Sequence, residues 1–195
     1  MIRARRGRWR EVGNADTDPP SVTGGTAVMR CLVRRGSAHD RPWVEAVLRE
    51  HWGGTTIVSR GTAHDGLSLP ALVAERDGTR CGILTYRLVD AECEIVTLNA
   101  VPGRQGTGSA LIDAVADEAR RAGGRRLWLI TTNDNLDALR FYQRRGFTLA
   151  AIHVNAMTDA RKLKPAIAMI GTYGIPIRDE IELERMLVAA PGRPA

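Results

Sequence analysis

Alternating hydrophobic and polar positions dominate the first half of the chain and predict strands. The clearest case is the segment 71–89, where two β-rich runs flank Asp77-Gly78, a dipeptide typical of a tight hairpin turn. The other predicted extended segments are 29–35, 55–61 and 92–101, and a loop is predicted at 62–70. Strands that follow one another through short turns indicate an antiparallel meander.

In the second half of the chain, helical spacing of hydrophobic residues alternates with strands. Leu111 and Val115 recur on one stripe of a helix predicted over 109–122. The segment 125–132 has a continuous apolar centre, as expected for a strand that is buried on both faces. The remaining predicted elements are helices at 40–52, 133–146 and 158–165 and strands at 147–154 and 179–187. Asp40 stands where the N-cap of the first helix is expected.

The order of these elements predicts an α/β (α+β) fold with a mixed, mostly antiparallel central sheet and helices on both of its faces. Strands 92–101 and 125–132 flank a helix, and such a crossover makes them parallel neighbours. A chain of 195 residues suits one domain with its own hydrophobic core. We expect this domain to span 29–195, after a disordered, basic and polar tail at 1–28.

Composition and charge narrow the classes of function. The net charge of +6 favours anionic partners, but aromatic residues make up only 5% and leave little material for stacking nucleic-acid bases. No segment approaches the roughly 18 apolar residues of a membrane span, and the four histidines do not cluster at metal-ligand spacing. Three cysteines without CxxC spacing are typical of reduced thiols in a cytoplasmic protein. We therefore expect no nucleic acid, membrane or metal partner, with a basic binding arm at 1–28 as the open alternative.

A glycine-rich segment, GRQGTG at 103–108, separates the strand 92–101 from the helix 109–122. It can be a strand-to-helix turn that needs glycine conformations. It can also be an anion cradle, because the first backbone N–H groups of a helix and its positive dipole end converge at such a place. The segment matches neither the P-loop pattern, which requires a lysine, nor GxGxxG. A diphosphate is the anion that suits it.

The segment NDNLDALRFYQRRGF at 133–147 is the second candidate for chemistry. It can be an amphipathic helix whose Leu139 and Tyr142 pack inward. Tyr142 also lies on the helix that follows the parallel partner strand, close to the predicted cradle. A tyrosine with its ordinary pKa near 10 is protonated at neutral pH and can donate a proton.

Together the two segments resemble the GNAT superfamily of acetyl-CoA-dependent N-acetyltransferases. VPGRQGTGSALI resembles that family's pyrophosphate loop, Q/R-x-x-G-x-G/A, and NLDALRFYQRRGF resembles its motif N-x-x-A-x-x-F-Y-x-x-x-G-F. The resemblance covers residues 29 to about 187. It departs from the family at one place, since the usual Arg or Gln position is Gly103 and Arg104 and Gln105 come one and two positions later.

The resemblance implies a GNAT-like fold in which the strand before the loop splays from its parallel partner where the cosubstrate acetyl-CoA enters. Backbone groups of that strand would face the pantetheine arm, the loop would hold the pyrophosphate, and the tyrosine would lie near the sulfur. The cofactor-binding residues that it implies are Leu98, Ala100, Arg104, Gln105, Gly106, Thr107, Gly108, Ser109, Asn135 and Tyr142.

The implied reaction is direct transfer of an acetyl group to a primary amine of a small molecule or peptide. Tyr142 would protonate the departing thiolate, and a backbone N–H beside the splay would stabilise the oxyanion. Glu94 would remove the proton of the amine, with Glu92 in reserve, although a solvated strand position is equally open for both. The sequence gives few signals for the residues that bind the amine. The candidates in predicted loops, which are also consistent with ordinary surface contacts, are Arg60, His64, Asp65, Tyr173 and Arg178.

Two other functions stay open at this point. A non-catalytic acyl-CoA-binding regulatory protein would keep the cradle and lose turnover, but it would not need Tyr142 as a proton donor. A nucleic-acid-binding protein would account for the basic charge and would show salt-sensitive affinity. Many members of the superfamily form dimers, so a homodimer is also open, and the sequence leaves the amine and the range of acyl groups undetermined.

Overall fold

The computed structural model describes residues 31–100 and 106–187. The expected tail at 1–28 and two of the expected cofactor-binding residues, Arg104 and Gln105, lie outside the described residues. Within those ranges, no helix is long and apolar enough to cross a membrane.

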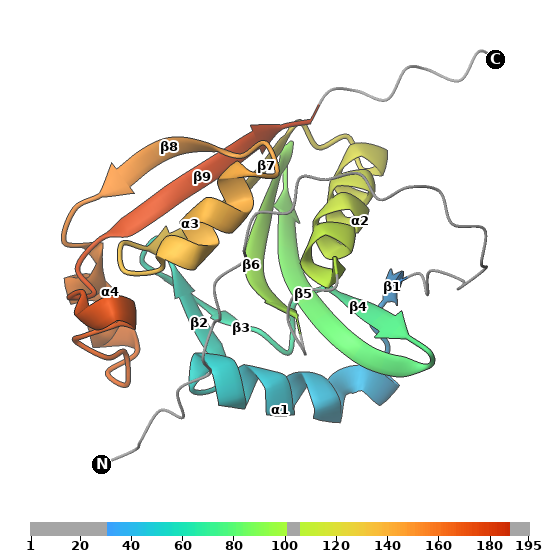
Figure 1. The fold of residues 1–195 in the computed structure, drawn as a ribbon, viewed down its shortest axis with the longest axis horizontal. Helices are drawn as coiled ribbons and strands as arrows, with labels where there is room; N and C mark the ends of the chain where they lie inside the picture. The colour runs from blue at the N-terminus through green and yellow to red at the C-terminus, as the bar shows by residue number, and fades with distance from the viewer. Residues whose placement is uncertain (1–30, 101–105, 188–195) are drawn as a thin grey trace, which may run out of the picture.

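Seven strands form the central sheet in the order β1-β4-β5-β6-β7-β9-β8, and β2 and β3 form a separate two-stranded sheet (Figure 1). Every pairing in the large sheet is antiparallel except that between β6 and β7, which is parallel, so the predicted fold class is confirmed. The strands are β1 (Leu32–Arg35), β2 (Thr56–Ser59), β3 (Thr62–Asp65), β4 (Ala71–Arg76), β5 (Thr79–Val89), β6 (Glu92–Ala100), β7 (Arg126–Thr132), β8 (Thr148–His153) and β9 (Glu180–Met186). The helices are α1 (Arg41–Trp52), α2 (Thr107–Arg121), α3 (Leu136–Gln143) and α4 (Ala156–Leu163), with short 3-10 turns η1 (Ala38–Asp40) and η2 (Thr172–Gly174).

The prediction of a loop at 62–70 is wrong in its first half, where β3 pairs with β2 in a hairpin. Arg60 and Gly61 form the tip of this hairpin with φ angles of 46° and 68°. Such positive values favour Asn or Gly, so an arginine at the first position gives no turn signal in the sequence. The strand itself, Thr-Ala-His-Asp, also lacks the β-branched alternation on which the other strands were predicted.

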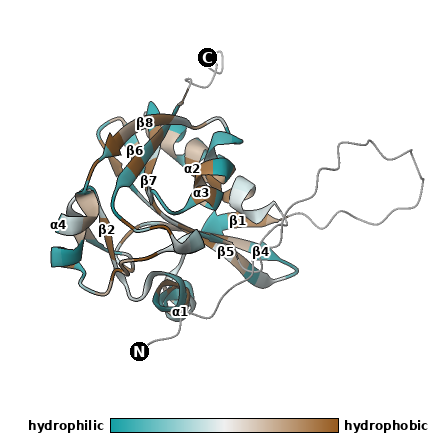
Figure 2. Ribbon diagram, turned by 60° about the vertical axis from the view of Figure 1, so that its left-hand side comes forward, coloured by the Kyte–Doolittle hydropathy of each residue, from teal (hydrophilic) through white to brown (hydrophobic). Residues whose placement is uncertain are grey.

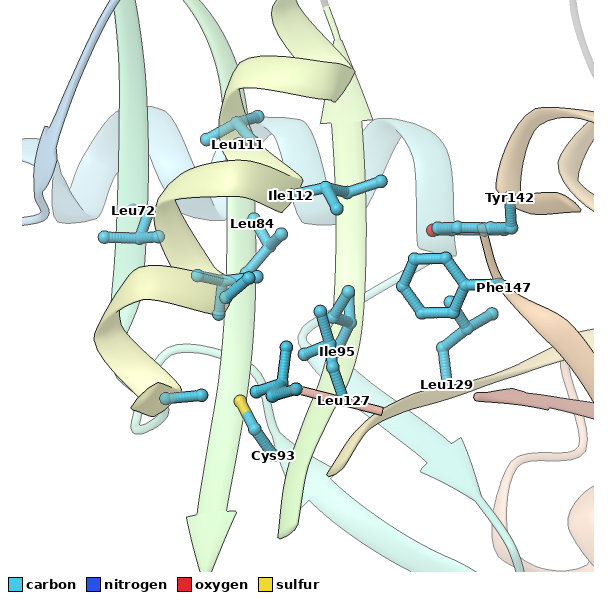
Figure 3. Close-up of a cluster of buried hydrophobic side chains, with 14 of the residues drawn as sticks. Leu72, Leu84, Cys93, Ile95, Leu111, Ile112, Leu127, Leu129, Tyr142 and Phe147 are labelled. Atoms are coloured by element: carbon cyan, nitrogen blue, oxygen red, sulfur yellow. The ribbon is translucent and has the colours of Figure 1, made fainter. Parts of the chain in front are cut away.

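Two hydrophobic cores lie on opposite faces of the large sheet. One packs α2 against the strands and includes Leu84, Leu111 and Leu127, all fully buried, together with side chains of α3 (Figure 3). The other packs α1 against the strands around Leu48 and includes Ile57 of the small hairpin. The central strands are predominantly hydrophobic, whereas α1 and α4 carry hydrophilic stretches on their outer sides (Figure 2).

The parallel pairing of β6 with β7 is short. It runs from Glu92 opposite Arg126 to Ile95 opposite Leu129 and then stops, although β6 continues to Ala100 beside β5 and β7 continues to Thr132 beside β9. Beyond Ile95 the two halves of the sheet therefore diverge, and α3 lies in the angle between them (Figure 1).

A buried carboxylate fastens the N-terminal strand and helix to the sheet. Asp40 is 1% exposed and accepts hydrogen bonds from both terminal nitrogens of Arg34, at 2.7 and 2.9 Å, and from Arg80 Nε at 2.8 Å. The Ser37 backbone N–H and hydroxyl also donate to it. Asp40 does precede α1, as predicted for an N-cap, but its side chain makes no capping bond because these other donors occupy it.

We predict that Asp40→Asn lowers the free energy of unfolding by about 2–3 kcal/mol, because it leaves two guanidinium groups without their common counter-ion. This is below the cost of breaking a fully buried pair, since the side chains of Arg34 and Arg80 are 33% and 35% exposed. The arginines hold the pKa of Asp40 far below its ordinary value. The stabilisation should therefore be complete above about pH 4 and decline as the pH falls further.

Urea unfolding of both proteins between pH 7 and pH 2 measures this difference. Asp159→Asn is the matched control, because Asp159 pairs with Lys162 at a fully solvated i,i+3 position and its loss should cost under about 0.5 kcal/mol. Equal losses for the two variants at pH 7 would contradict the role given to Asp40.

Candidate active site

A cleft of about 820 Å³ opens where β6 and β7 separate. Its walls include the diverging parts of both strands, from Ile95 to Ala100 and from Leu129 to Thr131, and the first residues of α2. Trp52 of α1 contributes from one face of the sheet, whereas Tyr142 of α3 contributes from the other. The cleft is therefore accessible to residues from both faces, which only the loss of strand pairing permits.

The start of α2 forms one end of the cleft. Gly106 precedes the helix with φ 78°, a left-handed conformation, and as the N-cap it has no side chain to cap the first turn. A Cβ on Gly108 would come within 2.8 Å of the Phe141 ring, so glycine allows α3 to approach α2 closely. The uncapped N–H groups and the positive end of a 15-residue helix face this part of the cleft.

Among the described residues, three arginines and one carboxylate, Asp137, line the cleft, so its charge is positive. Arg140, Arg144 and Arg145, at the C-terminal end of α3, all line it. A cleft of this volume, lined by a helix N-terminus and several guanidinium groups, fits a large ligand that carries phosphates, as CoA does. Among the described residues there is no group of three or more His, Cys, Asp and Glu side chains arranged to hold a metal ion.

Tyr142 is the one expected catalytic residue that lines this cleft. It is 8% exposed, and its ring packs edge-on against Phe141 and Phe147 with centroids 5.1 and 5.4 Å away. Its hydroxyl extends from α3 toward the gap beside β6 (Figure 3) and has no hydrogen-bond partner among the described residues. Burial raises the pKa of Tyr142 above its ordinary value, so the hydroxyl stays protonated through neutral pH.

The other expected cofactor-binding residues within the described ranges converge on the same cleft. Leu98 and Ala100 line it from β6, Gly106 to Gly108 line it from α2, and Ser109 adjoins them on the same helical turn. Asn135 lines it too, but its side chain is engaged as the N-cap of α3 and accepts a hydrogen bond from the Ala138 N–H at 3.2 Å.

Trp52 is a cleft residue that the sequence did not single out. Its indole N–H donates to Asn99 Oδ1 at 2.7 Å, which ties the end of α1 to the diverging part of β6. Lys164, just after α4, donates to the carbonyls of Trp52 and Thr56 at 2.6 Å each. No motif marks these residues, because the contact joins segments that lie far apart in the sequence.

Glu94 faces a second, smaller hollow of about 340 Å³ on the α1 side of β6. It is 3% exposed, and the Ser59 hydroxyl donates to its Oε1 at 2.6 Å, while Arg87 Nε lies 3.5 Å from Oε2. Glu94 comes directly before Ile95 and Val96, which line the large cleft, so it lies at the boundary of the two spaces. Glu92 lies farther from the cleft and pairs with Arg126 at 3.1 Å.

Glu180 of β9 is a further buried carboxylate near Glu94. It is 2% exposed and accepts a hydrogen bond from the Arg60 backbone N–H at 3.2 Å. Burial raises the pKa of Glu180, and the negative charge of Glu94 raises it further. The alternation of β9 predicted a strand but not that this carboxylate would face β6.

The loop residues expected to bind the amine substrate do not all lie at one site. Arg60 and His64 line the smaller hollow, since β2 and β3 form one of its walls. Asp65 accepts hydrogen bonds from the neighbouring Leu67 N–H and Ser68 hydroxyl and stabilises its own turn. Tyr173 donates to Asp137 at 2.8 Å, and Arg178 pairs with the adjacent Asp179.

Comparison with known proteins agrees with this geometry. The model of the acetyltransferase (GNAT) family matches residues 34–147. The uncharacterised protein YdhI of Bacillus subtilis (strain 168) is 40% identical over 140 residues, which are 71% of this chain and 87% of that protein.

Solved structures share the fold. The IAA acetyltransferase from Bacillus cereus ATCC 14579 matches with a TM-score of 0.61 at 22% identity, over 81% of this chain and all of that one. A GNAT family acetyltransferase from Elizabethkingia anophelis with acetyl-CoA bound matches with a TM-score of 0.58 at 18% identity, over 80% of this chain and 98% of that one. The family match runs from within β1 to the residue before β8 and so spans more than half of the chain, and we conclude that the protein belongs to the GNAT acetyltransferase family.

Proposed function

We propose that the protein is an acetyl-CoA-dependent N-acetyltransferase that transfers the acetyl group directly to a primary amine of a small molecule or peptide. The observation that carries this proposal is the position of Tyr142, a buried tyrosine that lines a cleft between parallel strands and whose hydroxyl has no hydrogen-bond partner among the described residues. A proton donor in that position serves a reaction that expels a thiolate. Binding alone would not require it.

Acetyl-CoA would occupy the large cleft and supply the acetyl group as an activated thioester. The uncapped first turn of α2, from Gly106 to Ser109, would hold the diphosphate through backbone N–H groups. Leu98, Ala100 and Asn135 would flank the pantetheine arm. The bound acetyl-CoA of the Elizabethkingia structure supports this choice of cosubstrate. Contacts from Arg104 and Gln105 belong to the proposal as well, although these residues lie outside the described ones.

Glu94 is our candidate for the general base. Its carboxylate is held by Ser59 on the α1 side of β6, just before the part of that strand that lines the cleft. From there it would remove the proton of the incoming amine through a water molecule, because a protonated amine has no lone pair for attack. Glu92, the reserve candidate, is 49% exposed and engaged by Arg126.

Tyr142 and the backbone of β6 would act on the other side of the reacting carbonyl. Where β6 no longer pairs with β7, every second residue has an N–H directed into the gap, and such a group can stabilise the developing negative charge. Tyr142 would then donate its proton to the departing sulfur. Its raised pKa keeps that proton in place over the working pH range.

We predict that Tyr142→Phe lowers kcat by about 100-fold and leaves the affinity for CoA within about threefold of the wild-type value, because only the hydroxyl group is lost and the ring stays in place. Release of CoA thiol from acetyl-CoA across a panel of primary amines measures kcat, and titration calorimetry measures the affinity. Because burial raises the pKa of Tyr142, the wild type should show no loss of kcat from its deprotonation up to about pH 10. Unchanged turnover in Tyr142→Phe would show that Tyr142 is not the proton donor. A wild type that binds CoA without any turnover would favour a non-catalytic acyl-CoA-binding regulatory protein.

We predict that Glu94→Gln lowers kcat/KM for the amine by about 100-fold at pH 7. The difference in kcat/KM between Glu94→Gln and the wild type should shrink toward pH 9–10, because solvent then deprotonates the amine and the base becomes dispensable. Glu92→Gln, on the same strand and face, is the matched control and should change kcat/KM by less than about threefold. The reverse ranking of the two variants would move the base to Glu92.

A further inference from the structure

Arg145 carries a positive charge that no carboxylate of the described residues neutralises. Among the described residues none of the ion pairs within 4.0 Å includes it, and its side chain lines the large cleft beside the start of α2. Burial lowers the pKa of Arg145, the charge of Arg144 lowers it further, and Asp113 opposes this only from a distance beyond ion pairing. An arginine side chain is not deprotonated in proteins, so Arg145 stays charged even so.

The guanidinium is nevertheless held in place. Its Nε and one terminal nitrogen donate to Ser109 Oγ at 2.8 and 2.6 Å, and the other terminal nitrogen donates to the Phe141 carbonyl at 2.8 Å. Its central carbon lies 3.6 Å from the centroid of the Phe141 ring. These partners are neutral, so they fix the position of the charge without compensating it.

This arrangement depends on the close contact between α2 and α3. Phe141 packs against Gly108, where any Cβ would collide with the ring, and Arg145 stacks on the same ring. The charge is thereby fixed next to Ser109, in the first turn of α2, whose backbone N–H groups are uncapped. A guanidinium has five N–H donors, of which three are used in the contacts above, so two remain for a ligand.

We propose that Arg145 is a diphosphate-binding residue that acts from the α3 side, opposite the backbone N–H groups of the first turn of α2. This inference rests on the proposed use of acetyl-CoA and adds a named side chain to it. The family motif N-x-x-A-x-x-F-Y-x-x-x-G-F leaves this position unspecified, so the motif does not prescribe an arginine here. The diphosphate is the fitting group because the free donors lie at the same helical turn as the uncapped N–H groups, and both serve one anion.

The test compares the affinities of CoA and dephospho-CoA, which lacks the 3′-phosphate but keeps the diphosphate, by titration calorimetry. Arg145→Met should weaken the binding of both ligands by the same factor, about 10- to 100-fold, as expected for the loss of charge-assisted hydrogen bonds. The difference in affinity between Arg145→Met and the wild type should narrow in 0.5 M salt, because screening weakens the contribution of the charge. A purely structural role for Arg145 would leave that difference independent of salt.

Two variants serve as controls. Arg121→Met removes the same charge at the far end of α2, where Arg121 pairs with Glu118, and should change the affinity for CoA by less than about twofold. Ser109→Ala removes a hydrogen-bond partner of Arg145 and keeps the charge of Arg145. Its loss of affinity for CoA should therefore be clearly smaller than that of Arg145→Met. Wild-type affinity in Arg145→Met, or a loss confined to CoA, would overturn the assignment to the diphosphate. A wild type that binds neither ligand would instead refute the proposed function itself.

Discussion

The end of hydrogen bonding between β6 and β7 after Ile95 and Leu129 is the constraint on which the site depends. Each strand keeps its outer partner, β5 or β9, so neither can close the gap without losing pairing elsewhere. The cleft formed there is bordered by two firmly paired half-sheets, and residues from both faces of the sheet reach it. A site that lies between strands, with backbone groups left free for a ligand, follows directly from this topology.

The distribution of charge follows the same division. On the side of α2 and α3, Arg140, Arg144 and Arg145 line the cleft, and Arg145 contacts Ser109 in the first turn of α2, which favours phosphate. On the other side, the buried carboxylates of Glu94 in β6 and Glu180 in β9 lie near enough for the charge of Glu94 to raise the pKa of Glu180. Under the proposed function, the basic side chains border the cleft for CoA, and Glu94 lies with Arg60 and Arg87 at the hollow beside it.

Contacts far from the cleft hold these faces in position. The Asp40 carboxylate joins β1, the start of α1 and β5 through Arg34 and Arg80. At the other end of α1, Lys164 binds the Trp52 carbonyl while the Trp52 indole binds Asn99. Both ends of α1 are therefore fixed, one to the sheet and one to the diverging strand, and the wall of the cleft on this face has little freedom to shift.

The sequence by itself determined the elements whose signals are local. The Asp77-Gly78 turn, the helical stripe around Leu111 and the crossover between two strands were sufficient for the mixed sheet and its parallel pair. Gly106, Gly108 and Tyr142, which the sequence singled out, line the cleft. Only the tertiary structure decided what depends on partners distant in sequence: the β2–β3 hairpin with Arg60 at its tip, the use of Asp40 by arginines in place of a cap, and the burial of Glu180 beside Glu94. It also brought Arg145 against Ser109, because that contact requires α2 and α3 to pack as closely as Gly108 allows. Periodicity reports how a segment meets its own neighbours, whereas the charge and hydrogen bonds of a site are set by the segments that packing brings together.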